Sequence, residues 1–239
     1  MWRFVAPAFA DRYQIVLFDY VGSGKSDLTA YNEKRYGSLD GYAQDVLDIC
    51  EALNLRDVIF VGHSVSSVIG MLAAKRAPER FARLVFVGPS ASYINDPPDY
   101  LGGFDRPDIE GLLEMMDKNY LGWASFLAPA VMKNPDDPDL TAELEQSFCA
   151  TDPKIARRFA QVTFLSDNRS DFAQLKVPAL IMQCSDDSIA PLTAGEFLAR
   201  QIPGSTFRLM KATGHCPHMS APAETIAIIQ DYLARAGAA

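Results

Sequence analysis

Short apolar runs alternate with helical patterns along most of the chain, and this alternation limits the folds that it can adopt. Each run is rich in β-branched or aromatic residues, and a turn separates it from a segment with helical spacing of apolar side chains. Such strands, alternating with helices, are typical of a parallel sheet covered by helices on both faces. We expect strands at residues 13–19, 57–62, 84–87, 177–184 and 205–209, and helices at residues 39–53, 65–77, 192–201 and 223–235.

The alternation stops between residues 92 and 165, where the sequence has helical periodicity but no strand pattern. Helices are expected there at residues 109–120, 120–132, 141–148 and 153–164. A helical insert in an α/β chain indicates a lid, residues 92–165, over a core formed by residues 1–91 and 166–239. The alternative is a second, independent domain.

Composition excludes several classes of partner. Lys and Arg number 22 and Asp and Glu number 30, so the formal charge is −8. Binding to nucleic acid or to an anionic membrane surface depends on clustered positive charge, so neither is expected. No apolar run reaches the roughly 18–20 residues of a membrane span, and the first residues do not have the pattern of a signal peptide.

The cysteines indicate the compartment. Four occur, none in a C-x-x-C pair, and most of them lie in apolar stretches. Buried free thiols fit a reducing environment, so we expect a cytoplasmic protein without disulfides.

The candidate nucleophile is Ser64, in the pentapeptide Gly-His-Ser-Val-Ser at residues 62–66. The pentapeptide follows a predicted strand and opens a predicted helix, which is the setting in which G-x-S-x-G forms a nucleophile elbow. Ser66 replaces the last glycine, and because serine is also small we expect the turn to survive with slightly more crowding. A serine in a strand–helix turn by chance is the alternative.

A serine nucleophile needs a base that is held by an acid, and the elbow predicts the order Ser, Asp or Glu, His. Among three histidines, His63 is expected to point away from Ser64, and His215 follows the last strand after a flexible turn. We favour His215 as the base, with His218 as a capping or packing residue. After the fourth strand we favour Asp187 as the acid over Asp186, which is expected to serve the turn.

No metal and no cofactor are expected. A zinc site at residues 215–218 would need a fourth ligand and would occupy the base. Residues 22–26, Gly-Ser-Gly-Lys-Ser, look like a phosphate-binding P-loop, but Asp19 stands where that motif requires its first glycine.

The chain as a whole resembles the α/β-hydrolases. Residues 16–27, Val-Leu-Phe-Asp-Tyr-Val-Gly-Ser-Gly-Lys-Ser-Asp, resemble the strand–turn signature of that family, and residues 62–66 resemble its elbow. Residues 95–100, 102–104, 166–167 and 214–220 are similar to one subfamily, which holds RsbQ-type bacterial stress-response hydrolases and the plant strigolactone and karrikin receptors. The RsbQ branch is the most similar.

This resemblance implies site residues. It implies a triad of Ser64, Asp187 and His215 under a V-shaped lid of four helices, with the Val65 N–H as an oxyanion donor. It also implies a substrate pocket at Tyr93, Phe104, Trp123, Leu127, Cys149 and Phe164.

The chain departs from the family at its start. The family has three strands before residues 13–19, and the loop after the third supplies a second N–H to the oxyanion site. The expected place of that third strand is between residues 13–19 and 57–62, so two strand edges would face a gap. We expect Met1 to be internal to a longer native chain; the alternative is a weak or inactive paralogue. The 239-residue chain is expected to be poorly soluble alone.

These observations predict a serine hydrolase for a small hydrophobic ester or lactone. A ligand-sensing protein that works with a phosphatase partner in a stress response is the alternative, which the resemblance suggests. A cofactor-free haloperoxidase would share the same triad. A haloalkane dehalogenase is disfavoured because its nucleophile is Asp, whereas this chain has Ser64.

Overall fold

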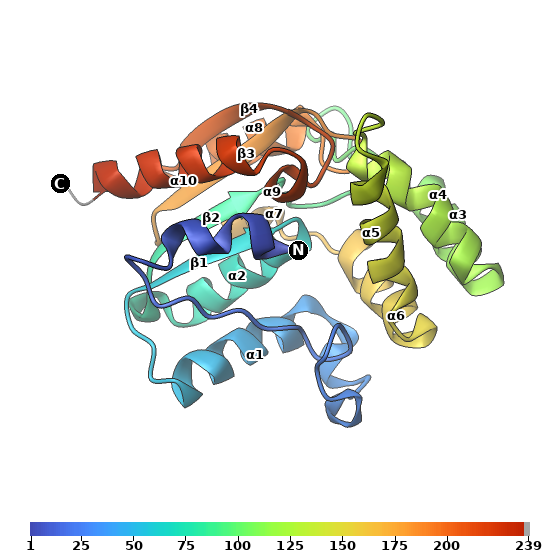
Figure 1. Ribbon diagram of the computed structural model, residues 1–239, viewed down its shortest axis with the longest axis horizontal. Helices are drawn as coiled ribbons and strands as arrows, with labels where there is room; N and C mark the ends of the chain where they lie inside the picture. Colours follow the sequence, from blue (N-terminus) through green and yellow to red (C-terminus); the bar gives the residue numbers. More distant parts are fainter. Residues whose placement is uncertain (237–239) are drawn as a thin grey trace.

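A parallel sheet forms the centre of the computed structural model, which describes residues 1–236 (Figure 1). Its strands are β1 (Val58–His63), β2 (Phe81–Val87), β3 (Ala179–Asp186) and β4 (Thr206–Thr213), hydrogen-bonded in that spatial order. All neighbours pair in parallel. The predicted strands at 57–62, 84–87, 177–184 and 205–209 are therefore found, with ends that differ by a few residues.

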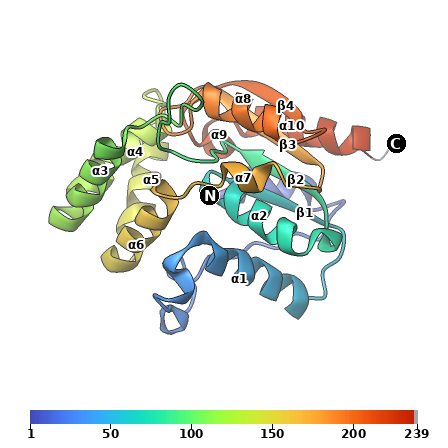
Figure 2. The same ribbon diagram turned by 180° about the vertical axis from the view of Figure 1, so that it is seen from behind.

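Helices cover both faces of this sheet, as predicted (Figures 1 and 2). Leu84 and Phe86 share one apolar cluster with α1 (Leu39–Ala52), α2 (Val65–Arg76), α7 (Arg169–Phe172) and α8 (Leu192–Gln201). The alternate residues Val85 and Val87 join a second cluster with α10 (Pro222–Ala236) and the amino-terminal segment. Because successive strand side chains point to opposite faces, the continuous apolar run of β2 supplies both clusters.

Short helices complete these layers. The amino-terminal segment contains the 3₁₀ helices η1 (Trp2–Phe4) and η2 (Ala6–Phe9), and α9 (Pro217–Ser220) follows β4. Further 3₁₀ turns are η3 (Leu28–Ala30), η4 (Arg35–Gly37) and η5 (Pro78–Arg80).

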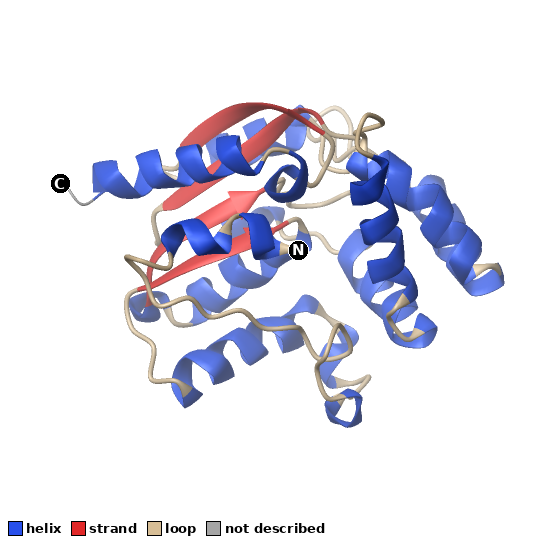
Figure 3. Cartoon of the chain, in the orientation of Figure 1, coloured by secondary structure: helices blue, strands red, loops and turns tan. Residues whose placement is uncertain are grey.

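Four helices lie at one end of the sheet, in the region predicted to be helical (Figure 3). They are α3 (Arg106–Lys118), α4 (Tyr120–Met132), α5 (Pro138–Cys149) and α6 (Pro153–Phe164). Their buried faces form a third apolar cluster, which also contains Ile189, Cys216 and Met219 from segments that follow β3 and β4. The helices therefore lie over the carboxyl ends of the strands, where sites of α/β sheets assemble.

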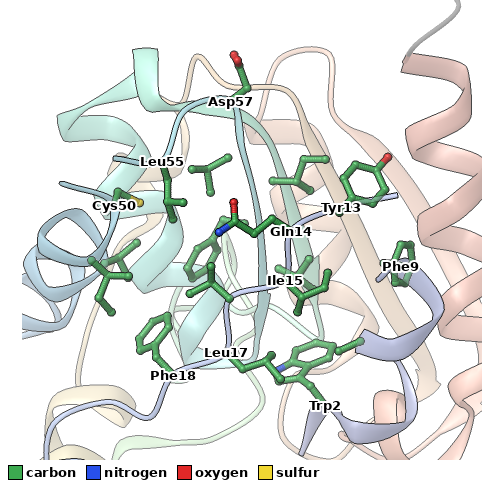
Figure 4. Close-up of a pocket in the computed structure, with 18 of the residues that line it drawn as sticks. Trp2, Phe9, Tyr13, Gln14, Ile15, Leu17, Phe18, Cys50, Leu55 and Asp57 are labelled. Atoms are coloured by element: carbon green, nitrogen blue, oxygen red, sulfur yellow. The ribbon is translucent and has the colours of Figure 1, made fainter. Parts of the chain in front are cut away.

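The strand predicted at residues 13–19 is wrong. Residues 14–18 are extended but lie outside the sheet, drawn as a loop in Figure 3. Ile15, Val16, Leu17 and Phe18 are 36–63% exposed. An apolar pattern alone does not make a strand, because a strand also needs a hydrogen-bonded neighbour, and a groove separates this segment from β1 (Figure 4).

Within residues 1–236, no helix is both long enough and apolar enough to cross a bilayer.

Close packing of α2 on β1 gives a stability prediction. A Cβ added to Gly70 in α2 would lie 2.3 Å from the ring of Phe60 in β1, which is buried. We expect Gly70→Ala to lower the free energy of unfolding by about 1–3 kcal/mol, because overpacking must displace the ring or the helix.

Gly111→Ala is the matched control, because Gly111 lies in α3 with nothing within 4 Å of an added Cβ. This change should raise the free energy of unfolding by about 0.5–1 kcal/mol through helix propensity and chain entropy. Urea denaturation of both variants measures the difference, and equal stabilities would contradict the packing argument.

Candidate active site

Ser64 lies in a sharp turn between β1 and α2. Its φ of 55° and ψ of −126° form a conformation that non-glycine residues rarely adopt. The Ser64 N–H donates to the Val87 carbonyl at 2.8 Å, which fastens the turn to β2. A Cβ on Gly62 would lie 2.6 Å from the Ser66 carbonyl oxygen, so the close approach of strand and helix requires glycine there. Serine at position 66 is accommodated in this turn.

His215 and Asp187 converge on this serine. His215 Nε2 lies 2.7 Å from Ser64 Oγ, and its Nδ1 lies 2.7 Å from Asp187 Oδ2. Asp187 follows β3 and His215 follows β4. Because these neighbouring strands are parallel, their carboxyl ends lie at the same edge of the sheet, and the two residues lie close together there. His215 is 3% exposed and Asp187 is 7% exposed, so their pairing is screened from water. A charged or polar interaction is stronger in such surroundings.

Hydrogen bonds define the roles of these atoms. Asp187 is ionised, so the Nδ1–H of His215 donates to Asp187 Oδ2 and Nε2 is left to accept the Ser64 hydroxyl proton. The other carboxylate oxygen of Asp187 accepts the backbone N–H groups of Ile189 and Ala190, at 2.8 and 3.0 Å. Burial alone raises the pKa of Asp187, but the attraction and hydrogen bond of His215 and these two N–H groups outweigh it and hold the pKa below its usual value.

The other acidic and histidine residues near the site make different contacts. Asp186 is exposed and pairs with Lys133 at 2.5 Å. The Nε2–H of His63 donates to the His215 carbonyl oxygen at 2.6 Å. His218 is fully buried and packs against other rings.

A row of rings in tilted contact was not foreseen from the sequence. Trp2 lies 4.6 Å from His218, His218 lies 4.4 Å from His63, and His63 lies 4.8 Å from His215, measured between ring centroids. We call these four residues the ring row. Both ring nitrogens of His218 lack a hydrogen-bond partner within residues 1–236. His215 and His218, three positions apart in the sequence, were the available signal, but nothing in the sequence placed His63 or Trp2 beside them.

The predicted pocket residues divide into two groups. Tyr93, Trp123 and Leu127 are buried in the lid cluster, and Phe104 and Phe164 are half-buried against it. Cys149 is exposed at the end of α5, and the structure does not bring it into that cluster.

Tyr93 reaches the serine itself. Its hydroxyl lies 3.2 Å from Ser64 Oγ, and since the Ser64 proton is directed to His215, the Tyr93 hydroxyl is the donor. Burial raises the pKa of Tyr93, so this hydroxyl keeps its proton.

The buried His218 predicts a pH dependence of stability. Burial lowers the pKa of His218 well below 6.5, so the unfolded chain binds a proton there that the folded chain does not. Above the unfolded-state pKa of about 6.5, His218 therefore does not change the free energy of unfolding. Below that pH, the free energy of unfolding falls by up to about 1.4 kcal/mol per pH unit.

His218→Phe tests this dependence, since a phenyl ring keeps the ring contact with Trp2 and the imidazole nitrogens have no hydrogen-bond partner to lose within the described residues. We expect the unfolding free energy of the variant to decline less steeply between pH 7 and pH 5 than that of the unchanged chain. Urea denaturation at each pH measures it. Identical slopes would mean that His218 is protonated in the folded state.

Comparisons with known proteins agree with this geometry. A family model described as the alpha/beta hydrolase fold matches residues 1–222. The chain is 35% identical to a karrikin insensitive receptor of Petunia hybrida, covering 96% of this chain and 85% of the receptor. It is 33% identical to a strigolactone esterase of Arabidopsis thaliana, covering 98% of this chain and 87% of the esterase.

Solved structures extend the comparison. A hydrolase from Oleispira antarctica superposes with a TM-score of 0.94 at 44% identity, over 97% of this chain and 85% of that chain. An enol-lactonase from Burkholderia xenovorans, at 20% identity and a TM-score of 0.81 over 98% of this chain and 85% of its own, shares the fold. From the sheet, the elbow and these matches, the chain belongs to the α/β-hydrolase family.

Proposed function

We propose that this protein is a serine hydrolase for small hydrophobic esters or lactones, with Ser64 as nucleophile, His215 as general base and Asp187 as the residue that orients the base. The observation that carries the proposal is the 2.7 Å contact of Ser64 Oγ with His215 Nε2, whose other nitrogen is held by Asp187. A serine hydroxyl at its ordinary pKa is a weak nucleophile, and an adjacent base is the usual means of activating it.

In the proposed reaction, Ser64 Oγ bonds to the substrate carbonyl carbon as its proton passes to His215 Nε2. The negative charge that develops on the carbonyl oxygen is stabilised at the start of α2, where the Val65 N–H is the first of the helix and has no intrahelical partner. Collapse breaks the ester bond, and His215 returns the proton to the departing alkoxide. Water then repeats the two steps on the acyl-serine and releases the acid.

Asp187 contributes by holding His215. Its carboxylate fixes the imidazole tautomer that leaves Nε2 free, and its negative charge stabilises the imidazolium that forms during attack. The two backbone N–H groups on its other oxygen hold the carboxylate ionised and in place.

The lid supports the choice of substrate class. Tyr93, Trp123, Leu127, Phe104 and Phe164 present aromatic and aliphatic groups in one cluster around the lid helices, and we propose that they contact the substrate. An apolar surround favours a small hydrophobic molecule over a peptide or a sugar. We leave Cys149 out of this set because its side chain is exposed. Relatives titled strigolactone esterase and enol-lactonase fit the same class.

A serine-reactive sulfonyl fluoride tests the nucleophile. We expect the intact mass to show one sulfonyl group on the unchanged chain and none on Ser64→Ala. Ser67→Ala is a matched control, because Ser67 lies in the same turn but is fully buried and donates to the Gly62 carbonyl. Labelling that survives in Ser64→Ala, or no labelling of the unchanged chain, would contradict an activated Ser64.

Asp187→Asn tests the orienting role. The amide can donate to His215 Nδ1 and so selects the wrong tautomer, and the rate constant kcat for an ester such as p-nitrophenyl acetate should fall by up to on the order of 10⁴-fold. Asp186→Asn is the control, because Asp186 contacts Lys133 at the surface. Equal rates in both variants would remove Asp187 from the mechanism.

A second candidate is ligand sensing, with hydrolysis slow or absent. Two observations favour it: relatives of this chain are titled karrikin receptors, and Leu121 and Phe126 of the lid helix α4 are 63% and 59% exposed. Exposed apolar side chains on a lid can bind a partner protein once ligand is held below. The RsbQ resemblance suggests a stress-response protein phosphatase as that partner.

Leu121→Ser and Phe126→Ser separate the two functions. If the protein is a sensor, the variants lose signalling in the host while the hydrolysis rate stays unchanged; if it is a simple hydrolase, neither the host response nor the hydrolysis rate changes. Lys118→Ser on the neighbouring helix α3 is the control, since its ion pair with Glu114 is fully at the surface.

A further inference from the structure

The main chain of His215 is held on both sides. Its N–H donates to the Val131 carbonyl oxygen at 2.8 Å, in the last turn of the lid helix α4. Its carbonyl oxygen accepts the Nε2–H of His63 at 2.6 Å. These two hydrogen bonds act on the backbone of the proposed base, whereas Asp187 acts on its ring. Together they fix the place from which the imidazole of His215 reaches Ser64.

The second of these bonds comes from the residue next to the proposed nucleophile. His63 is the last residue of β1 and pairs with Val87 of β2. The N–H of Ser64, the next residue, donates to the Val87 carbonyl at 2.8 Å. One short segment, fastened to β2 at both residues, therefore carries both Ser64 Oγ and the donor that holds the His215 backbone.

The protonation state of His63 suits a permanent donor. A carbonyl oxygen only accepts hydrogen bonds, so the proton of the neutral ring lies on Nε2. Burial, together with repulsion by His215, lowers the pKa of His63 to about 3. His63 therefore stays neutral from pH 5 to pH 8, and it adds no positive charge beside the imidazolium that His215 becomes during attack.

Packing gives a simpler reason for a ring at this position. His63 lies between His215 and His218, with ring centroids at 4.8 and 4.4 Å. An aromatic side chain without a donor would make those contacts equally well. It would leave the His215 carbonyl without the 2.6 Å hydrogen bond, and a buried acceptor that loses its donor is costly. The two readings differ in whether the donor matters, which an experiment can decide.

We infer that His63 is a positioning residue for the proposed base: its Nε2–H holds the His215 main chain so that the imidazole Nε2 meets Ser64 Oγ. The inference rests on the proposed function, since a base is positioned only if His215 acts as one. His63 acts through the backbone of His215 and not on the reacting atoms, so it is not a catalytic residue.

His63→Gln and His63→Met form a matched pair. Both side chains are similar in length and both lose the ring, but the Gln amide can donate to the same carbonyl and Met cannot. For hydrolysis of p-nitrophenyl acetate we expect kcat of the Gln variant within about threefold of the unchanged chain, and kcat of the Met variant about tenfold lower or more, because a small misplacement of a catalytic group is expensive. KM should agree within about twofold, since the bond acts on the base and not on substrate binding.

Two further measurements separate the hydrogen bond from packing and folding. His218→Phe keeps a ring against His63, and His218 makes no hydrogen bond within residues 1–236, so its kcat should match that of the unchanged chain. Urea denaturation shows whether the Gln and Met variants are folded under the assay conditions. The rate at which the sulfonyl fluoride labels Ser64 should follow kcat through the series.

NMR of the imidazole nitrogens tests the contact without relying on the Met variant. In the unchanged chain, the His63 signals should report a neutral ring with its proton on Nε2 and should stay constant from pH 5 to pH 8. The spectrum of His63→Gln, which lacks these signals, assigns them.

Several results would overturn the inference. Equal kcat in the Gln and Met variants, with an active unchanged chain, would remove the positioning role and leave the proposed function standing. A loss in His218→Phe as large as that in His63→Met would assign the effect to ring packing. A His63 proton on Nδ1, or a titration between pH 5 and pH 8, would remove the donor. An unchanged chain that neither hydrolyses the ester nor takes the sulfonyl group would overturn the proposed function itself, and this inference with it.

Discussion

The close approach of β1 to α2 is the constraint on which the rest of the site depends. Gly62 and Gly70 let the helix start directly against the strand, and this forces Ser64 into its strained conformation above the carboxyl edge of the sheet. The neighbouring parallel strands β3 and β4 end at that edge, so the loops that carry Asp187 and His215 reach the serine without long excursions. The arrangement of the proposed triad is therefore a consequence of how tightly one helix packs on one strand.

Short sequence patterns were enough to predict the elbow and the residues that contact Ser64. Glycines around a serine after an apolar run predicted the elbow, and chain order selected His215 and Asp187 as partners, which lie within 2.7 Å contacts of the expected atoms. The observed contacts agree with those predictions because each prediction depends on a few adjacent residues and on the common edge of a parallel sheet. The choice between Asp187 and Asp186 depended on loop geometry, and in the structure Asp187 contacts His215 while two backbone N–H groups hold its carboxylate.

Non-local features were the ones that sequence reasoning missed. Residues 14–18 have the composition of a buried strand, yet a strand exists only where a neighbour pairs with it, and composition carries no information about that neighbour. Likewise, the contact of Trp2 with His218 joins residues more than two hundred positions apart. Cys149 was assigned to the pocket by analogy of position, and its place at the exposed end of α5 depends on where that helix stops.

The ring row has a practical consequence for handling the protein. Trp2 is separated from the imidazole of His215 by only two rings, those of His218 and His63, so the first residues of the chain lie near the proposed base. Met1 is exposed beside Trp2, and a purification handle or a fluorescent label attached there is therefore three ring contacts away from His215. Activities measured on two samples of this protein should therefore be compared only when both carry the same group at the amino terminus, just as buffer and temperature are kept the same.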